Sequence, residues 1–200
     1  IHSGKTIDSL WELATKLGAK ILTGANVDSI IQNNVTVKTV TDSVTFKSQK
    51  VVICTNAFTM DLFPELDVVP GRGQVMITEP INDLKFKGTF HIKQGYFYFR
   101  NVGNRVLIGG GRHLDFKGEE TIELNQTRLI QNKLEALLKT TILPKTLFEI
   151  DYRWSGIMGV GNQKKAIVKQ VSNHVFCGVR LGGMGIAIGS LIGKELAELI

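Results

Sequence analysis

The sequence predicts an α+β fold in which an α/β unit is interrupted by an antiparallel sheet. Residues 50–57 form a continuous apolar run, which is typical of a parallel strand covered on both faces. Residues 174–193 predict a second buried strand, a glycine-rich turn and an apolar helix. Between these segments, several short strands separated by Gly/Asn turns indicate antiparallel hairpins. We therefore expect the α/β part over residues 1–66 and 155–200, and the antiparallel part over residues 67–154.

The N-terminal part begins with a helix, predicted over residues 6–17. Its apolar positions share one helical stripe, and Gly18 is placed to end the helix. A short strand is predicted at residues 19–23. Two weakly alternating segments, residues 35–40 and 44–47, predict a polar-faced antiparallel hairpin, and residues 50–57 predict a central strand. The small and polar residues that end this strand are a candidate edge of a ligand site, or a simple strand-to-loop turn.

The middle part is predicted to contain strands at residues 75–78, 91–92, 95–100 and 105–111, with a hairpin turn at residues 102–104. A helix is predicted over residues 121–138 from its leucine and isoleucine spacing, and a strand over residues 147–154. The last elements are a strand at residues 175–179 and a helix that runs from the glycine turn to the C-terminus.

The glycine-rich turn contains Gly182, Gly183 and Gly185. Glycine permits positive φ and close approach of a ligand, and the helix that follows presents free N–H groups and a positive dipole end. Two interpretations fit: a site for an electron-rich ligand, or a tight strand-to-helix turn with nothing bound. Small residues recur every fourth position from Gly185 to Ala197, which indicates a flat neighbour against that helix face.

Composition narrows the function classes. The net charge is +6, but the basic residues are scattered and form no stripe with aromatics, so we expect no nucleic-acid partner. Lys194, Glu195 and Glu198 interrupt the last apolar run, so we expect no membrane span. The two cysteines lie in apolar strands and are predicted to be buried free thiols in a reducing, cytoplasmic compartment. The four histidines lack metal-ligand spacing, and we expect no metal site.

The order of these parts resembles the FAD-dependent oxidoreductases of the D-amino-acid oxidase family, which includes glycine oxidase and sarcosine oxidase. The resemblance rests on an ordered set of short motifs: GANVDSI at 24–30, VVICTNA at 51–57, PGRGQ at 70–74, YFYFR at 96–100, VLIGGG at 106–111, WSGIMG at 154–159, and the closing strand, glycine turn and helix. The G-x-G-x-x-G fingerprint is absent, and Asn56 stands where the family has Gly. The chain, which begins without Met, is expected to be the C-terminal two-thirds of a longer protein with an incomplete FAD/NAD(P)-binding fold.

The resemblance implies which residues meet FAD. The backbone of Val27 would face the adenine end, and Cys54, Thr55 and Asn56 would line the path of the cofactor at the sheet edge. The pyrimidine side of the flavin would meet Gly182, Gly183, Met184, Gly185 and Ile186. The implied reaction is hydride transfer from a small amino acid, secondary amine or 2-hydroxy acid to flavin, and no catalytic base is identified. Without the fingerprint segment, these 200 residues are not expected to bind FAD tightly.

A substrate carboxylate would need a fixed cation, and arginine binds carboxylates bidentately. Arg180 is the leading candidate because it precedes the glycine turn, followed by Arg100 and Arg153, and then Arg72. Tyr98 and Tyr96 would add hydroxyl groups. An alternative function is a non-catalytic module that binds a ligand or partner through the same fold without FAD. The glycine-rich helix face would then be a surface for self-association.

Overall fold

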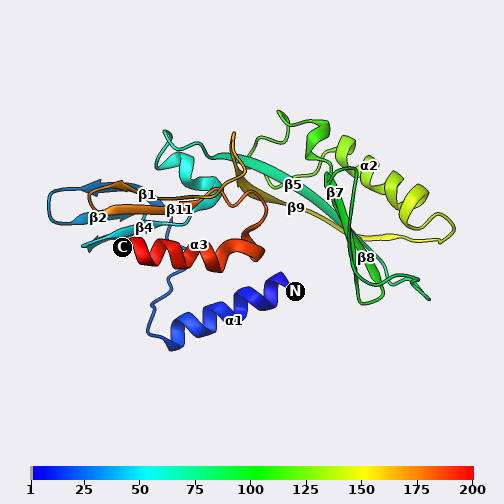
Figure 1. Ribbon diagram of the computed structural model, residues 1–200, viewed down its shortest axis with the longest axis horizontal. Helices are drawn as coiled ribbons and strands as arrows, with labels where there is room; N and C mark the ends of the chain where they lie inside the picture. Colours follow the sequence, from blue (N-terminus) through cyan, green and yellow to red (C-terminus); the bar gives the residue numbers. More distant parts are fainter. Residues whose placement is uncertain (1) are drawn as a thin grey trace. The chain divides into compact units, whose positions relative to one another are not determined.

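The structure is a computed structural model that describes residues 2–200, and the chain divides into two compact units (Figure 1). Unit 1 consists of Ile1–Leu66 and Lys165–Ile200, and unit 2 of Asp67–Lys164. The second boundary lies between residues 164 and 165 rather than between 154 and 155, which are both inside strand β9 (Ile150–Val160). Strand β9 belongs to unit 2 because it pairs with β5 (Val69–Thr78) along almost the whole length of both strands.

Unit 1 contains two three-stranded sheets. The first has the order β1-β2-β3 and is antiparallel, with β1 at Val27–Gln32, β2 at Val37–Thr41 and β3 at Thr45–Ser48. The predicted hairpin is confirmed by the pairing of β2 with β3. The strand predicted at residues 19–23 is wrong, because those residues form no regular element and are mostly exposed.

The second sheet of unit 1 has the order β10-β11-β4. Strand β11 (Val175–Val179) is buried at all five positions, runs antiparallel to β10 (Ile167–Ser172) and parallel to β4 (Val51–Ile53). Among residues 2–200, β4 pairs only with β11 and therefore lies at the edge of the sheet. It is also only three residues long, so the prediction of a central strand at residues 50–57 is wrong for this part of the chain. The 3-10 helix η1 (Asn56–Asp61) begins shortly after it.

Two helices complete unit 1. Helix α3 (Gly185–Leu199) packs on the second sheet, where Leu196 lies so close to Gly178 that a Cβ there would come within 2.8 Å of its side chain. Helix α1 (Ser3–Lys16) begins with a cap, in which the Lys5 N–H donates to Nδ1 of His2 at 3.3 Å. None of its residues is buried. Residues 2–200 include no helix with the length and apolar content that crossing a bilayer demands.

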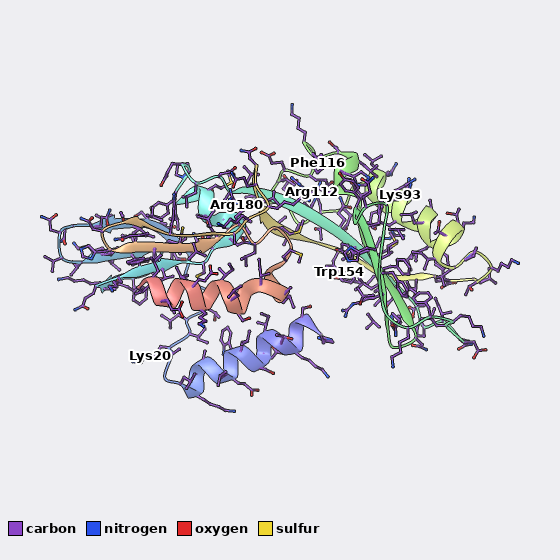
Figure 2. The ribbon with its side chains drawn as sticks, viewed as in Figure 1. Lys20, Lys93, Arg112, Phe116, Trp154 and Arg180 are labelled. Atoms are coloured by element: carbon purple, nitrogen blue, oxygen red, sulfur yellow. The ribbon has the colours of Figure 1, made fainter. Side chains whose placement is uncertain are left out.

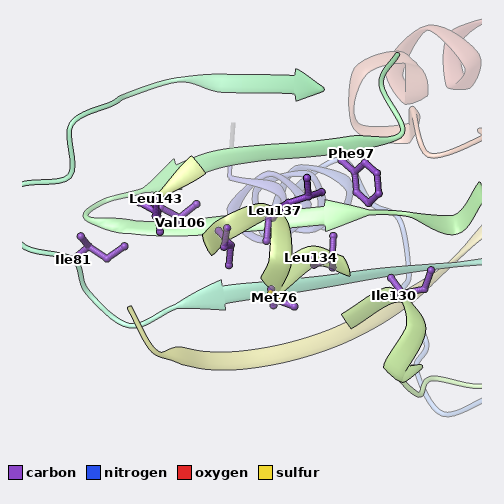
Figure 3. Close-up of a cluster of buried hydrophobic side chains, with 10 residues drawn as sticks. Met76, Ile81, Phe97, Val106, Ile130, Leu134, Leu137 and Leu143 are labelled. Atoms are coloured by element: carbon purple, nitrogen blue, oxygen red, sulfur yellow. The ribbon is translucent and has the colours of Figure 1, made fainter. Parts of the chain in front are cut away.

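Unit 2 is built on one five-stranded antiparallel sheet with the order β6-β7-β8-β5-β9. The remaining strands are β6 (Thr89–Ile92), β7 (Phe97–Val102) and β8 (Arg105–Gly110). A short 3-10 helix, η2 (Arg112–Leu114), follows β8. Helix α2 (Arg128–Leu137) and the π-helical turn η3 (Leu138–Ile142) supply apolar side chains to the core of this unit (Figure 3). That core consists of Met76, Ile81, Phe97, Val106, Ile108, Ile130, Leu134, Leu137, Leu138 and Leu143.

The predicted helix over residues 121–138 is wrong at its N-terminal end, since α2 begins at Arg128. The reason is a set of hydrogen bonds to the β5 side chains. The Nη1 group of Arg72 donates to Asn125 and to the carbonyl oxygen of Glu123, and the Thr127 N–H donates to Oε1 of Gln74 at 3.0 Å. These contacts hold residues 123–127 in a non-helical path. The strand predicted at residues 147–154 is found three residues later, at Ile150–Val160.

Candidate functional site

The glycine turn of unit 1 is held in a left-handed conformation. Arg180, Gly182 and Gly183 have φ values of +61°, +57° and +81°. The Met184 N–H donates to the carbonyl oxygen of Leu181 at 2.8 Å and closes the turn. Helix α3 starts at the next residue, and no side chain caps it. The Ala187 N–H donates to the carbonyl oxygen of Met184 at 2.9 Å, and the N–H groups of Gly185 and Ile186 remain for an acceptor from outside the helix.

A hydrogen bond connects this turn to the first residue of η1, shortly after β4. The Leu181 N–H donates to Oδ1 of Asn56 at 3.1 Å, and Asn56 itself has a φ of +47°. Asn tolerates the left-handed region better than other residues with a Cβ, which explains how Asn56 can stand where the family has Gly. The hydrogen bond thus brings two predicted parts of the cofactor site, residues 54–56 and residues 182–186, close together within unit 1.

Arg180 is buried, with 6% of its surface exposed. Its Nε donates to the carbonyl oxygen of Lys165 at 2.8 Å, and the residue has a further interaction partner. These contacts fasten the β10 end of the sheet to the glycine turn. A substrate-binding role for Arg180 stays a prediction, and it would require the guanidinium to serve a ligand in addition to this structural contact.

A cavity of about 530 Å³ lies beside the end of β4, and Val27 and Thr55 both line it. The other lining residues are Ala25, Asn26, Asp28, Phe58, Asp61 and Leu62. Its volume falls in the range of small-molecule sites. Cys54 is exposed as a residue, yet desolvation still raises the pKa of its thiol, so it is protonated at neutral pH. Cys177 is buried and also free, and desolvation raises the pKa of its thiol.

The residues present fit part of FAD. A Cβ built at Gly182 meets no atom within 4 Å, so the turn presents bare backbone to open space. Met184 and Ile186 beside it are exposed. An uncapped helix N-terminus suits the electron-rich edge of a flavin ring. The G-x-G-x-x-G turn that holds the pyrophosphate of such cofactors is not among the 200 residues.

In unit 2, Arg72 is a structural residue. It is 3% exposed, and its Nε and Nη2 donate to the two carboxylate oxygens of Glu119, both at 2.9 Å. The hydrogen bond to Glu119 raises the pKa of Arg72. Burial alone would raise the pKa of Glu119, but the hydrogen bonds from Arg72 and Gln74 outweigh it and lower that pKa. With its Nη1 group bonded to residues 123 and 125, Arg72 has no nitrogen left for a substrate.

The other predicted substrate residues of unit 2 lie in its sheet. Arg153 on β9 donates to Oε1 of Gln131 at 2.8 Å and forms an ion pair with Glu135, so it would have to leave these partners to bind a substrate. Arg100 on β7 also has an interaction partner. Tyr98 covers Gly109, where a Cβ would lie 2.6 Å from the Tyr98 hydroxyl. Desolvation raises the pKa of Tyr98, which keeps this hydroxyl protonated. The predicted roles of these residues stay predictions.

Sequence reasoning missed Arg112. It follows three consecutive glycines, and this position next to a glycine-rich segment could have marked it as a candidate ligand-binding arginine. Its guanidinium carbon lies 5.1 Å from the ring centroid of Phe116 (Figure 2). Its Nε is buried and has no hydrogen-bond partner among the described residues.

The comparisons with known proteins agree with this architecture. A family model described as DAO, FAD dependent oxidoreductase, matches residues 1–199. No curated protein matches the chain. L-proline dehydrogenase from P. horikoshii is similar in structure, with a TM-score of 0.78 and 19% identity over 93% of this chain and 52% of that one. Glycine oxidase from Geobacillus kaustophilus has a TM-score of 0.78 and 20% identity, over 93% of this chain and 50% of that one.

A mutant of Amadoriase I from Aspergillus fumigatus has a TM-score of 0.77 and 14% identity, over 100% of this chain and 51% of that one. At such identities the likeness shows the fold, and the chain spans about half the length of these structures. The family match extends over nearly every residue and confirms the resemblance found in the motifs. The chain belongs to the DAO family of FAD-dependent oxidoreductases.

Proposed function

We propose that this chain forms part of the flavin site of an oxidoreductase that acts on a small amino acid, secondary amine or 2-hydroxy acid. The observation that carries the proposal is the uncapped N-terminus of α3 beside two left-handed glycines. The Asn56–Leu181 hydrogen bond adds to it by fixing this turn against the start of η1. FAD, when bound, supplies the group that accepts a hydride from the substrate carbon.

The residues of the turn would orient the cofactor in two ways. Gly182 and Gly183 lack a Cβ, so a ring can approach their backbone closely. The N–H groups of Gly185 and Ile186 would donate to an electron-rich ring edge, and the helix dipole would favour negative charge there. Met184 would flank the ring through its exposed side chain.

The cavity lined by Val27 and Thr55 would receive a more distant part of the same cofactor. Cys54 and Asn56 would line the path between that cavity and the turn, because they are the chain neighbours of Thr55. A protonated thiol at Cys54 adds no charge to this path. The substrate carboxylate is proposed to contact Arg180, Arg100 or Arg153, with the Tyr98 hydroxyl as a further donor.

A second candidate function is a non-catalytic module that associates with itself or a partner. Two features of unit 1 favour it. Cβ atoms built at Gly189 and Gly193 on α3 meet no atom within 4 Å, so this face of the helix is open. Strand β4 pairs with β11 and with no other strand among residues 2–200. Under this alternative, the chain would dimerise at micromolar concentration and flavin would not change its association.

The substitution Met184→Asp tests the flavin proposal. Met184 is the N-cap residue of α3, and Asp there would accept from the first-turn N–H groups and add a negative charge. We expect the helix to gain about 0.5–2 kcal/mol. FAD affinity and the flavin midpoint potential of the full-length protein should both fall, because the same N–H groups are no longer available.

Leu191→Asp is the matched control, since it adds the same charge to an exposed mid-helix position of α3. It should leave FAD affinity and midpoint potential unchanged. Binding is measured by flavin fluorescence quenching and the potential by dye equilibration. A Met184→Asp protein that is folded and binds FAD like the wild type, with the same potential, would refute the placement of flavin at this turn.

A further inference from the structure

Unit 2 contains a cavity of about 600 Å³ at the start of β5 and the end of β9. Its lining combines apolar walls with charges of both signs, from Asp67, Val69, Arg112, Phe116, Lys117, Glu120, Val160, Gly161 and Asn162. None of these residues belongs to the predicted flavin or substrate positions. The cavity lies entirely within one compact unit.

Arg112 is held rigidly beside this cavity. Its guanidinium lies over the Phe116 ring, an arrangement in which a cation is attracted to the face of the aromatic system. The guanidinium also lies next to Gly71, where a Cβ would come within 3.0 Å of the Arg112 Nε. Because Gly71 has no side chain, the guanidinium can pack against the β5 backbone. Arginine that is fixed in this way loses little further entropy when it binds a ligand.

The Arg112 Nε–H has no acceptor among residues 2–200, although it is buried. A buried donor without an acceptor is costly, and its cost is relieved by a ligand that accepts from it. Other arginines of unit 2 are already paired: Arg72 with Glu119, Arg105 with Asp151 and Arg153 with Glu135. No carboxylate pairs with Arg112 in the described chain, so its planar fork is suited to a carboxylate from outside.

The remaining charges of the lining indicate what else this ligand carries. Lys117 adds a second cation, while Asp67 and Glu120 add two carboxylates. The Asp67 oxygens accept from the backbone N–H of Asn162 at 3.1 Å and from its Nδ2 at 3.0 Å. Glu120 lies at the exposed side of the cavity. A ligand with one carboxylate and one ammonium group would complement both signs of charge.

We propose that this cavity binds a small zwitterionic amino acid with an apolar side chain. The carboxylate accepts from the Nε and a terminal nitrogen of Arg112, with Lys117 adding positive charge. The ammonium group faces Glu120. The side chain of the ligand packs against Val69, Phe116 and Val160, which supply the apolar part of the lining. This site requires no flavin, because all of its lining residues belong to unit 2.

Three ligands of matched shape test the proposal on the 200-residue chain: L-leucine, L-leucinamide and 4-methylpentanoate. The amide lacks the carboxylate, and the acid lacks the ammonium group. Binding is followed by calorimetry and by the side-chain Nε–H resonance of Arg112 in ¹⁵N-edited NMR spectra. We expect saturable binding of L-leucine that shifts this resonance, and a loss of about tenfold or more in affinity for L-leucinamide.

Two substitutions assign the groups. Arg112→Gln should weaken both L-leucine and 4-methylpentanoate by about tenfold or more. Glu120→Gln should weaken L-leucine and leave 4-methylpentanoate unchanged. The control is Arg128→Gln, at an exposed position on α2 outside the cavity. It should leave the affinities for L-leucine and for 4-methylpentanoate unchanged. Phe116→Leu keeps the cavity apolar and removes the ring below the guanidinium, and it should weaken carboxylate binding less than Arg112→Gln.

The proposal is overturned if L-leucine fails to bind saturably to the wild-type chain, or if L-leucinamide binds as tightly. It is also overturned if a folded Arg112→Gln protein, judged by its Trp fluorescence, binds L-leucine like the wild type. If Arg112→Gln does not fold, the proposal is tested instead by the affinities of the wild-type chain for the three ligands and by carboxylate binding to the Phe116→Leu protein. None of these results depends on FAD, so the flavin proposal stands or falls separately.

Discussion

Replacing Glu119 by Gln would remove one charge of a buried ion pair and leave the other unpaired. Glu119 is 1% exposed and Arg72 3% exposed. The carboxylate accepts from Nε and Nη2 of Arg72 and from Nε2 of Gln74, at distances of 2.8–2.9 Å. Gln has almost the same shape, so the substitution creates no cavity. Breaking a buried pair from one side costs about 3–5 kcal/mol, because an uncompensated charge stays buried.

The pKa of Glu119 adds a dependence on pH. It is lowered in the folded chain, so this carboxylate contributes stability above its unfolded pKa of about 4.3. That contribution is lost as the pH falls through the lower folded value. In the wild type, the free energy of unfolding should therefore decline steeply below about pH 4. In Glu119→Gln this part of the decline should be missing, because position 119 no longer titrates.

The assay is urea unfolding followed by the fluorescence of one tryptophan. The chain has two, Trp11 in α1 and Trp154 in β9. In a Trp11→Phe background, Trp154 reports unit 2 alone. We expect Glu119→Gln to lower the free energy of unfolding by about 3–5 kcal/mol at pH 7. Glu79→Gln is the control within unit 2, since its ion pair with Arg105 is partly exposed and should matter by less than about 1 kcal/mol.

A loss of unfolding free energy in Glu119→Gln no larger than that in Glu79→Gln would refute the reasoning. The double variant Arg72→Met/Glu119→Leu separates charge from packing. Because it removes both charges, it should be considerably more stable than Glu119→Gln alone. Equal instability of the single and double variants would show that the hydrogen bonds to residues 118–127 matter more than the buried charge.

Three further predictions concern stability and ionisation. Leu134→Ala should cost about 2–5 kcal/mol in urea unfolding because Leu134 is fully buried, whereas Leu129→Ala on the exposed side of α2 should cost little. Gly109→Ala should lower the free energy of unfolding by about 1–3 kcal/mol or more, because its Cβ would lie 2.4 Å from the Val75 side chain and 2.6 Å from the Tyr98 hydroxyl. Gly103→Ala is the comparison: its Cβ would meet no neighbour within 4 Å, so it reports only the strain of a positive φ. In an ultraviolet pH titration, Tyr98 should ionise above the usual range of tyrosine, and substitution to Phe should remove that late transition.

The sequence predicted the parts of the fold that rest on periodicity. Strand β11 and helix α3 are found at the predicted positions, because a buried apolar strand, glycines and an apolar helix leave a distinct pattern. The hairpin of β2 and β3 is found for the same reason. The extent of α2 could not be predicted in this way. Residues 121–127 have acceptable helical spacing, but side chains some fifty positions earlier in the chain, Arg72 and Gln74, bind them in another conformation.

The ranking of the arginines shows the same limit. Sequence reasoning ranked them by their distance from glycines and strand ends, and position alone cannot show which guanidinium already has a carboxylate. Arg72 and Arg153 meet theirs only because α2 and the segment before it fold over β5 and β9. Arg112 was missed although it follows three glycines, because its position in the sequence does not show that its buried Nε–H lacks an acceptor among the described residues.

The partner of an arginine is set by tertiary contacts, and this decides what each one can do. A guanidinium that donates from three nitrogens to its own chain, as in Arg72, must lose those bonds before it binds a ligand. A guanidinium that is packed on a ring and keeps a buried Nε–H without an acceptor, as in Arg112, gains a bond when a carboxylate arrives. The second situation favours binding on energetic grounds. The unmet hydrogen bond of Arg112 is thus better evidence for a carboxylate site than the position of any arginine in the sequence.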